Sequence, residues 1–163
     1  MTKRLILMRH AKSDWSHNLD DHERPLNKRG RQSAYMLKSW LGLNDYAPDQ
    51  VLCSSAERTQ ETLFRMDLGV KEITFLREMY LADTATLLEV LKKASGDCVL
   101  MIAHNPGIAY FAAQMVTSAP DHARFADYPT GATTVIDFDI DDWEDVAPCS
   151  GTAVDFTVPR DLT

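Results

Sequence analysis

Two histidines in this chain each follow directly after a run of apolar residues. His10 comes after Leu5–Met8 with Arg9 beside it, and His104 ends the run that begins at Cys98. Each run has the length and composition of a short buried strand. A neutral imidazole can act as a nucleophile or as a metal ligand, and the guanidinium fork of arginine matches phosphate oxygens. The pattern therefore indicates either phosphoryl chemistry or a metal site.

A further cationic residue, Arg58, occupies a comparable position. The second apolar run, Gln50–Cys53, is followed at once by a predicted helix with Ser55 as its N-cap and Arg58 in its first turn. Open α/β folds bind ligands beyond the carboxyl ends of their parallel strands. We therefore expect His10, Arg58 and His104 to converge at one sheet edge, next to helix N-termini that attract anions. A doubly charged phosphoryl group suits such a pocket.

Helices are predicted between the strands that carry these residues. Apolar positions recur at helical spacing from Leu26 to Leu41, and Asn27 is the expected N-cap of that helix. Gly30 in its first turn removes a side chain where the helix would pass close to another part of the backbone. Residues 84–94 form a second amphipathic pattern, and Asn105 followed by Pro106 predicts the start of a further helix.

The remaining strands complete an α/β pattern. A weaker strand over 70–76 is expected near an edge of the sheet, and two strands over 133–140 and 152–158 have no helix between them, which predicts a hairpin. We expect about four β–α units and then the hairpin, in a three-layer α/β/α sandwich with a mostly parallel sheet. The length of 163 residues, without a linker or repeat, predicts a single domain over 1–163.

Composition narrows the function classes. A formal net charge of −7 argues against non-specific nucleic-acid binding. No apolar run approaches the length of a membrane span, and the apolar run near the N-terminus is too short for a signal peptide, so a cytoplasmic location without membrane association is expected. The scattered cysteines predict buried reduced thiols at Cys53 and Cys98. The sequence does not predict the oligomeric state.

Each candidate also has a structural explanation. His104 alone could be a hydrogen-bonded core histidine, and Arg58 alone could be a surface ion-pair partner on a helix. Arg24 could cover the helix below it with its aliphatic stem. A metal site at His10 and His104 would need a third ligand, and arginines repel metal ions. His17 and His22 offer nothing beyond loop context, so neither is assigned a role.

Together these motifs resemble the histidine phosphatase superfamily, the phosphoglycerate-mutase-like proteins, and within it the short SixA-type branch of phosphohistidine phosphatases. Arg9-His10-Ala11 is similar to the Arg-His-Gly signature after the first strand, with alanine in place of glycine. The other matching segments, in family order, are RPLN at 24–27 followed by Gly30, SSAERTQET at 54–62 and AHNP at 103–106. The resemblance spans nearly the whole chain and implies the phosphoglycerate-mutase-like fold.

The resemblance implies a role for each matched residue. His10 would be the nucleophile that forms a phosphohistidine intermediate, and Arg9, Arg58 and His104 would bind the phosphoryl oxygens. Arg24 and Asn105 would also contact the substrate. Arginine charge can stabilise the transition state of phosphoryl transfer, so neither a metal nor another cofactor is expected.

The general acid is less well defined by the sequence. Family members that cleave esters use a carboxylate after the third strand, and Glu78 in LREMY is the nearest match. Glu78 could equally be a surface carboxylate at a strand end. Because 163 residues leave little room for insertions over the site, we expect a shallow pocket.

Three functions are compatible with the sequence. The first is a metal-independent phosphatase that acts on phosphohistidine in proteins. The second is a phosphatase of a small phosphorylated metabolite, and the third is a phosphate-binding module without turnover. The presence of the complete set of His10, Arg9, Arg58 and His104 argues against the third, since a binding module does not need the nucleophile.

Overall fold

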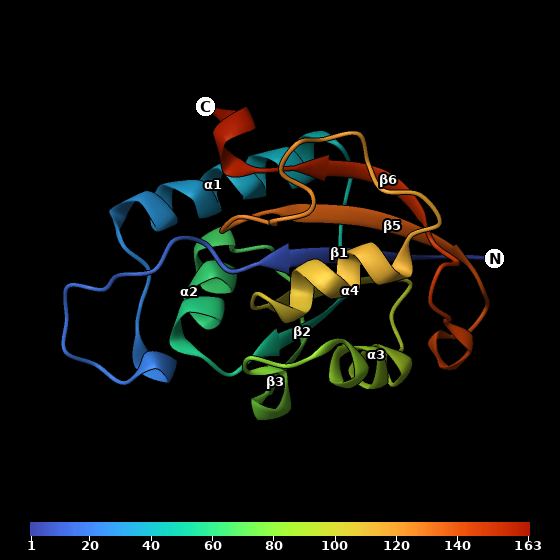
Figure 1. Cartoon of the computed structure of the whole chain (residues 1–163), viewed down its shortest axis with the longest axis horizontal. Coiled ribbons are helices and arrows are strands. Elements are labelled where there is room, and N and C mark those ends of the chain that lie inside the picture. The colour runs from blue at the N-terminus through green and yellow to red at the C-terminus, as the bar shows by residue number, and fades with distance from the viewer.

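The strands of the protein form one mixed sheet. A computed structural model describes residues 1–163, and its six strands lie in the order β3-β2-β4-β1-β5-β6 (Figure 1). The strands are β1 (Thr2–Arg9), β2 (Gln50–Ser54), β3 (Glu72–Leu76), β4 (Cys98–Ala103), β5 (Thr133–Asp139) and β6 (Thr152–Thr157). β1, β2, β3 and β4 are parallel, while β5 is antiparallel to β1 and to β6. The predicted parallel sheet with a carboxyl-terminal hairpin is thus confirmed.

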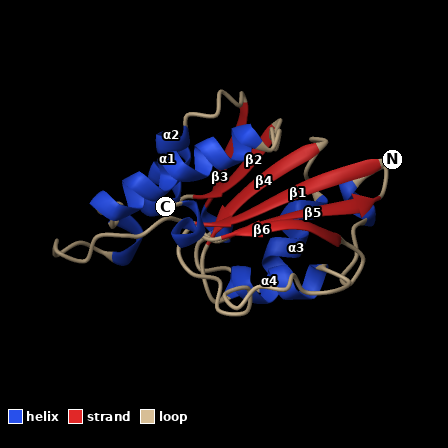
Figure 2. Ribbon diagram, turned by 90° about the horizontal axis from the view of Figure 1, so that it is seen from above, coloured by secondary structure: helices blue, strands red, loops and turns tan.

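Helices cover both faces of the sheet. They are α1 (Lys28–Leu43), α2 (Glu57–Met66), α3 (Thr84–Lys92) and α4 (Gly107–Met115). Figure 2 shows α1 and α2 on one face and α3 and α4 on the other, which is the predicted three-layer arrangement. No helix combines the length and the apolar character needed to cross a membrane.

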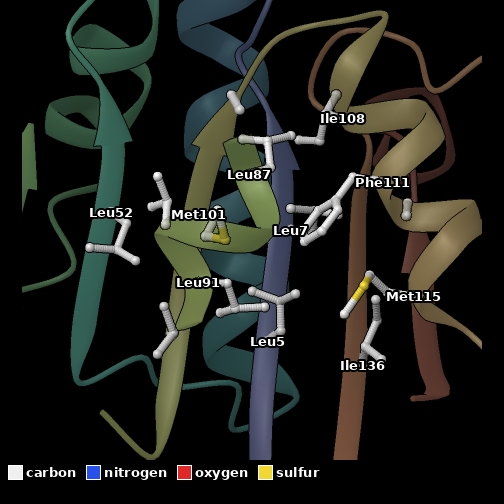
Figure 3. Close-up of a cluster of buried hydrophobic side chains, with 14 of the residues drawn as sticks. Leu5, Leu7, Leu52, Leu87, Leu91, Met101, Ile108, Phe111, Met115 and Ile136 are labelled. Carbon is white, nitrogen blue, oxygen red and sulfur yellow. The ribbon is translucent and has the colours of Figure 1, made fainter. Parts of the chain in front are cut away.

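The core lies on both sides of β1. Leu5 and Leu7 pack with Leu87 and Phe111 from α3 and α4 (Figure 3). Ile6 and its neighbours on the same face belong to the cluster under α1 and α2. Because strand side chains alternate between faces, a strand covered on both sides needs apolar residues at every position. This explains the unbroken apolar run before Arg9.

The helix starts differ in part from the sequence predictions. Asn27 does cap α1, since its Oδ1 accepts a hydrogen bond of 2.8 Å from the Gly30 N–H. Asn105 does not cap α4: its Nδ2 donates to main-chain carbonyls at Asp127 and Tyr128 instead.

The cap of α2 also differs from the prediction. The N-cap position falls on Ala56, and the hydroxyl of Ser55 bonds to the imidazole of His22 instead. Local capping rules would assign Asn105 and Ser55 to helix N-caps. In the folded chain, both side chains instead form hydrogen bonds with residues far away in the sequence.

Gly30 lies where α1 crosses the loop after β1. A Cβ at this position would be 2.1 Å from the Lys12 carbonyl oxygen, which is backbone and cannot rotate away. The same carbonyl accepts a hydrogen bond of 3.0 Å from the Asn27 N–H. The absent side chain therefore lets α1 hold the loop that follows His10.

We expect Gly30→Ala to destabilise the protein by about 1–3 kcal/mol, the usual cost of forced overpacking. Gly42→Ala on the same helix is the matched control, since a Cβ there meets nothing within 4 Å. The control should be neutral or more stable by about 0.5–1 kcal/mol, because alanine favours helix. Chemical denaturation of both variants measures this, and equal stabilities would contradict the close approach.

Candidate active site

One cavity collects most of the predicted residues at the carboxyl ends of β1 and β4. It has a volume of about 240 Å³. Its lining includes Arg9, His10, Arg24, Arg58, His104 and Asn105, together with Lys12, Ser13, Trp15, Leu81 and Thr130. The topology explains this gathering, because the segments that follow parallel strands emerge at the same edge of the sheet.

His10 is held in one tautomer by the main chain. Its Nδ1 lies 2.7 Å from the carbonyl oxygen of Ala11. A carbonyl can only accept, so Nδ1 carries the proton and Nε2 keeps its lone pair. The Nε–H of Arg58 points to that Nε2 at 3.4 Å. Burial, reinforced by His104, Arg9 and Arg58, lowers the pKa of His10 well below its ordinary value, so the ring is neutral near pH 7.

His104 stands beside His10, with ring centroids 5.3 Å apart. Its Nε2 lies 2.8 Å from the Ser54 hydroxyl, while its buried Nδ1 has no partner within the protein. Burial and the charge of Arg58 lower the pKa of His104 to about 3. This second imidazole is therefore also neutral and has one ring nitrogen free for a ligand.

Arg9 supplies charge at the end of β1. Its Nη1 donates to the Tyr128 carbonyl at 3.1 Å, and its buried Nε has no protein partner. Burial and the nearby Arg58 lower the pKa of Arg9, but a guanidinium remains protonated in proteins. The unpartnered Nε–H is thus a donor available to an oxyanion.

Arg58 is almost fully buried, with 3% of its surface exposed, and Asp21 is its counter-ion. Arg58 donates to the main-chain carbonyl of Asp21 at 2.7 Å and to its carboxylate at 3.0 Å. The same carboxylate accepts hydrogen bonds from Arg24 and from the Tyr80 hydroxyl. Although partial burial raises the pKa of Asp21, the bonds from Tyr80, Arg24 and Arg58 outweigh it and hold that pKa well below its usual range.

Sequence reasoning missed Asp21, Tyr80 and Ser54, and it left His22 without a role. The imidazole of His22 bonds to Ser55 and stacks edge-on against Tyr80, with ring centroids 4.7 Å apart. Asp21 was open to prediction, because it lies three residues before Arg24 at a spacing that suits an ion pair. No local signal marks Tyr80, since only the fold brings it near His104.

Arg24 and Trp15 form one wall of the cavity. The Arg24 guanidinium donates to the Ser13 hydroxyl at 2.6 Å and lies 3.4 Å from the centroid of the Trp15 ring. Arg24 itself is buried, whereas 76% of Trp15 is exposed. Arg24 thus lines the cavity, while its contact with a substrate stays a prediction.

Asn105 and Glu78 occupy different environments. Asn105 lines the cavity, and its Nδ2 and Arg9 both donate to the Tyr128 carbonyl. Glu78 is exposed on the short 3-10 helix η2 (Arg77–Met79) and is not among the residues that line the cavity. Its assignment as general acid stays a prediction.

A metal site was the alternative for His10 and His104. No group of three His, Cys, Asp or Glu side chains in the chain is placed to hold a metal ion. Arg9 and Arg58 lie close to the two imidazoles, and their positive charge repels cations.

Comparison with known proteins places this chain in a family. The model of the histidine phosphatase superfamily (branch 1) matches residues 5–87. The chain belongs to the histidine phosphatase superfamily. An uncharacterized protein of Mycobacterium tuberculosis (strain CDC 1551 / Oshkosh) is 32% identical over 161 residues, which cover 94% of this chain and all of that protein.

Solved structures share the fold of this family member. A structure assigned as the phosphohistidine phosphatase SixA of Nakamurella multipartitia has a TM-score of 0.87 at 24% identity, covering 98% of this chain and 97% of that one. The protein histidine phosphatase SixA complexed with tungstate has a TM-score of 0.75 at 22% identity, covering 98% and 99%. The predicted fold and family are therefore confirmed.

We predict that His104, with its pKa lowered to about 3, stays neutral from about pH 8 to pH 5. His10 should take up a proton only well below the pH of about 6.5 at which an unperturbed imidazole does, because burial lowers its pKa. The unfolded chain binds these protons below about pH 6.5 and the folded chain does not, so acidification lowers the free energy of unfolding. Imidazole ¹⁵N shifts followed by NMR give both the protonation state and the tautomer. A His10 midpoint close to that of a histidine peptide in the same buffer would contradict the assignment.

Proposed function

We propose that this protein is a metal-independent phosphatase that hydrolyses phosphohistidine in proteins through a covalent intermediate on His10. The observation that carries the proposal is the neutral His10 ring, whose Nε2 lone pair is set by the Ala11 carbonyl in a cavity lined by Arg9, Arg58 and His104. A neutral imidazole needs no separate base to attack phosphorus. Surrounding donors can stabilise charge that develops on the phosphoryl oxygens.

The reaction would proceed in two displacements. In the first, His10 Nε2 forms a bond to phosphorus as the bond to the substrate imidazole breaks, and that imidazole takes a proton from water in the open cavity. In the second, water attacks the phosphorus of phospho-His10, the P–Nε2 bond breaks, and phosphate is released with the proton of the attacking water lost to solvent. The net reaction converts phosphohistidine and water into histidine and phosphate.

The protonation states in the site favour a phosphohistidine substrate. An alkyl phosphate ester leaves as a poor alkoxide and needs a positioned acid. Asp21 is the carboxylate nearest to Arg58, but its depressed pKa keeps it ionised, and Glu78 lies outside the cavity lining. An imidazole leaving group accepts its proton readily near neutral pH. The similar protein histidine phosphatase SixA has been solved in complex with tungstate, an oxyanion, which supports oxyanion binding by a protein of this fold.

The covalent step is tested by trapping. Rapid quench with ³²P-labelled phosphohistidine substrate should give a phosphoenzyme that survives alkali and is lost in acid. His10→Ala should abolish both the label and the turnover. His17→Ala is the matched control, because His17 is exposed and does not line the cavity, and it should label normally. Label or full turnover in His10→Ala would overturn the nucleophile assignment.

The substrate class is tested by comparing kcat/KM in excess EDTA. We expect kcat/KM to be highest for phosphohistidine, lower for p-nitrophenyl phosphate, and lowest for phosphoserine and sugar phosphates. Arg58→Ala should lower all of these by about 100-fold or more, as loss of an oxyanion stabiliser does. Glu78→Gln should leave kcat/KM for phosphohistidine unchanged. It should lower kcat/KM for the alkyl esters only if Glu78 is the general acid. A metabolite ester that clearly exceeds phosphohistidine would favour the metabolite phosphatase instead.

A further inference from the structure

A second hollow adjoins the catalytic cavity and is lined by cationic side chains. It has a volume of about 240 Å³ and shares Lys12 and Thr130 with the catalytic cavity. Its basic residues are Lys12, Arg29, Arg124 and Arg160, which we call the basic surface. A further hollow of about 470 Å³ continues it past Arg29 and Arg160. A positively lined path therefore leads outward from the site of His10.

The charge of the basic surface is largely uncompensated. Of its four cations, only Arg124 forms an ion pair, at 2.9 Å to Asp127. Lys12, Arg29 and Arg160 form none, and no aspartate or glutamate lines either hollow. All four side chains are exposed. On a chain with a net charge of −7, this is a local region of positive potential.

Helix stability does not explain the position of Arg29. It lies in the first turn of α1, where no acidic residue is present. A cation at a helix N-terminus opposes the helix dipole and costs stability. Arg29 also makes no side-chain hydrogen bond or ion pair that would offset that cost. Because Arg29 lowers the stability of α1, its position points to a role in binding a partner.

The character of the surface favours a protein partner over a small molecule. Small-ligand sites are enclosed and mostly apolar, with a few fixed polar groups. Here the lining is mostly polar, the two hollows share Arg29 and Arg160, and the cationic side chains are long and exposed. Exposed charges of this kind steer and orient a macromolecule of opposite sign.

We propose that the basic surface docks acidic side chains that flank the phosphohistidine of a protein substrate, an inference that rests on the proposed function. Lys12 and Thr130 join this surface to the catalytic cavity, so a chain whose phosphohistidine reaches His10 would lay neighbouring residues across Arg29 and Arg160. Specificity would then come from the acidity of the sequence around the phosphohistidine, and the chemistry from the cavity.

The test uses two synthetic peptides that carry one phosphohistidine each, flanked either by aspartates or by asparagines, with free phosphohistidine as the reference substrate. For the wild type at low salt, we expect kcat/KM on the acidic peptide to exceed that on the neutral peptide by about 10-fold, through faster association. Salt at about 0.3 M should remove most of this advantage, since exposed charges are screened.

The decisive variant is Arg29→Glu with Arg160→Glu, because neither residue lines the catalytic cavity. It should lose the preference for the acidic peptide and keep its rate on free phosphohistidine within about 2-fold, as expected when only steering charges change. The glutamine double variant at the same positions serves if the glutamate variant fails to fold. Lys71→Glu with Lys93→Glu is the charge-matched control, and it should retain the preference.

The control lysines suit this purpose because both are exposed and unpaired, lie by the amino ends of the parallel strands and line neither hollow. Equal rates on the two peptides, or a preference that the control loses equally, would overturn the docking proposal while leaving the phosphatase intact. Strong competitive inhibition by pyrophosphate that the glutamate variant abolishes, without any peptide preference, would instead assign the surface to small polyanions. Failure to hydrolyse any of the three phosphohistidine substrates would overturn the proposed function itself, and the docking proposal with it.

Discussion

The ion pair between Arg58 and Asp21 is the interaction on which the site depends. A buried guanidinium without a counter-ion would cost several kcal/mol. Asp21 offsets this cost, because both its main-chain carbonyl and its carboxylate accept hydrogen bonds from Arg58. The Nε–H of Arg58 remains directed at His10. The same carboxylate also binds Arg24 and Tyr80. One acidic residue thus joins the loop after β1 to the start of α2 and to the segment after β3.

The sheet imposes the rest of the arrangement. β1 and β4 pair in parallel with Arg9 opposite Ala103, so His10 and His104 follow at the same level. The two apolar layers prevent β1 from shifting, because a shift of one residue would bring each side chain to the wrong face. The precision of the imidazole pair therefore comes from strand register and core packing, with no cross-link required.

The elements and the cationic cluster were predictable because their signals are local. Apolar runs, helical periodicity and the glycine in the first turn of α1 each act within a few residues of the chain. Residues that act through distant partners were not predictable in this way. Tyr80 lies near His104 only because of the topology. Asn105 and Ser55 do not cap the expected helices but form hydrogen bonds with distant residues. The counter-charge to Arg58 is likewise supplied from a different loop.

The choice of a main-chain carbonyl to orient His10 has a consequence for how this site tolerates sequence change. The Ala11 oxygen would be present whatever residue stood there, so the tautomer of the ring is independent of side-chain identity at that position. The Ala11 N–H is in turn fixed by the Thr62 hydroxyl at 3.0 Å. Alanine can therefore replace the glycine of the family signature without altering which nitrogen bears the lone pair. The orientation of the His10 ring thus depends on the backbone at residue 11 and not on which side chain that residue carries.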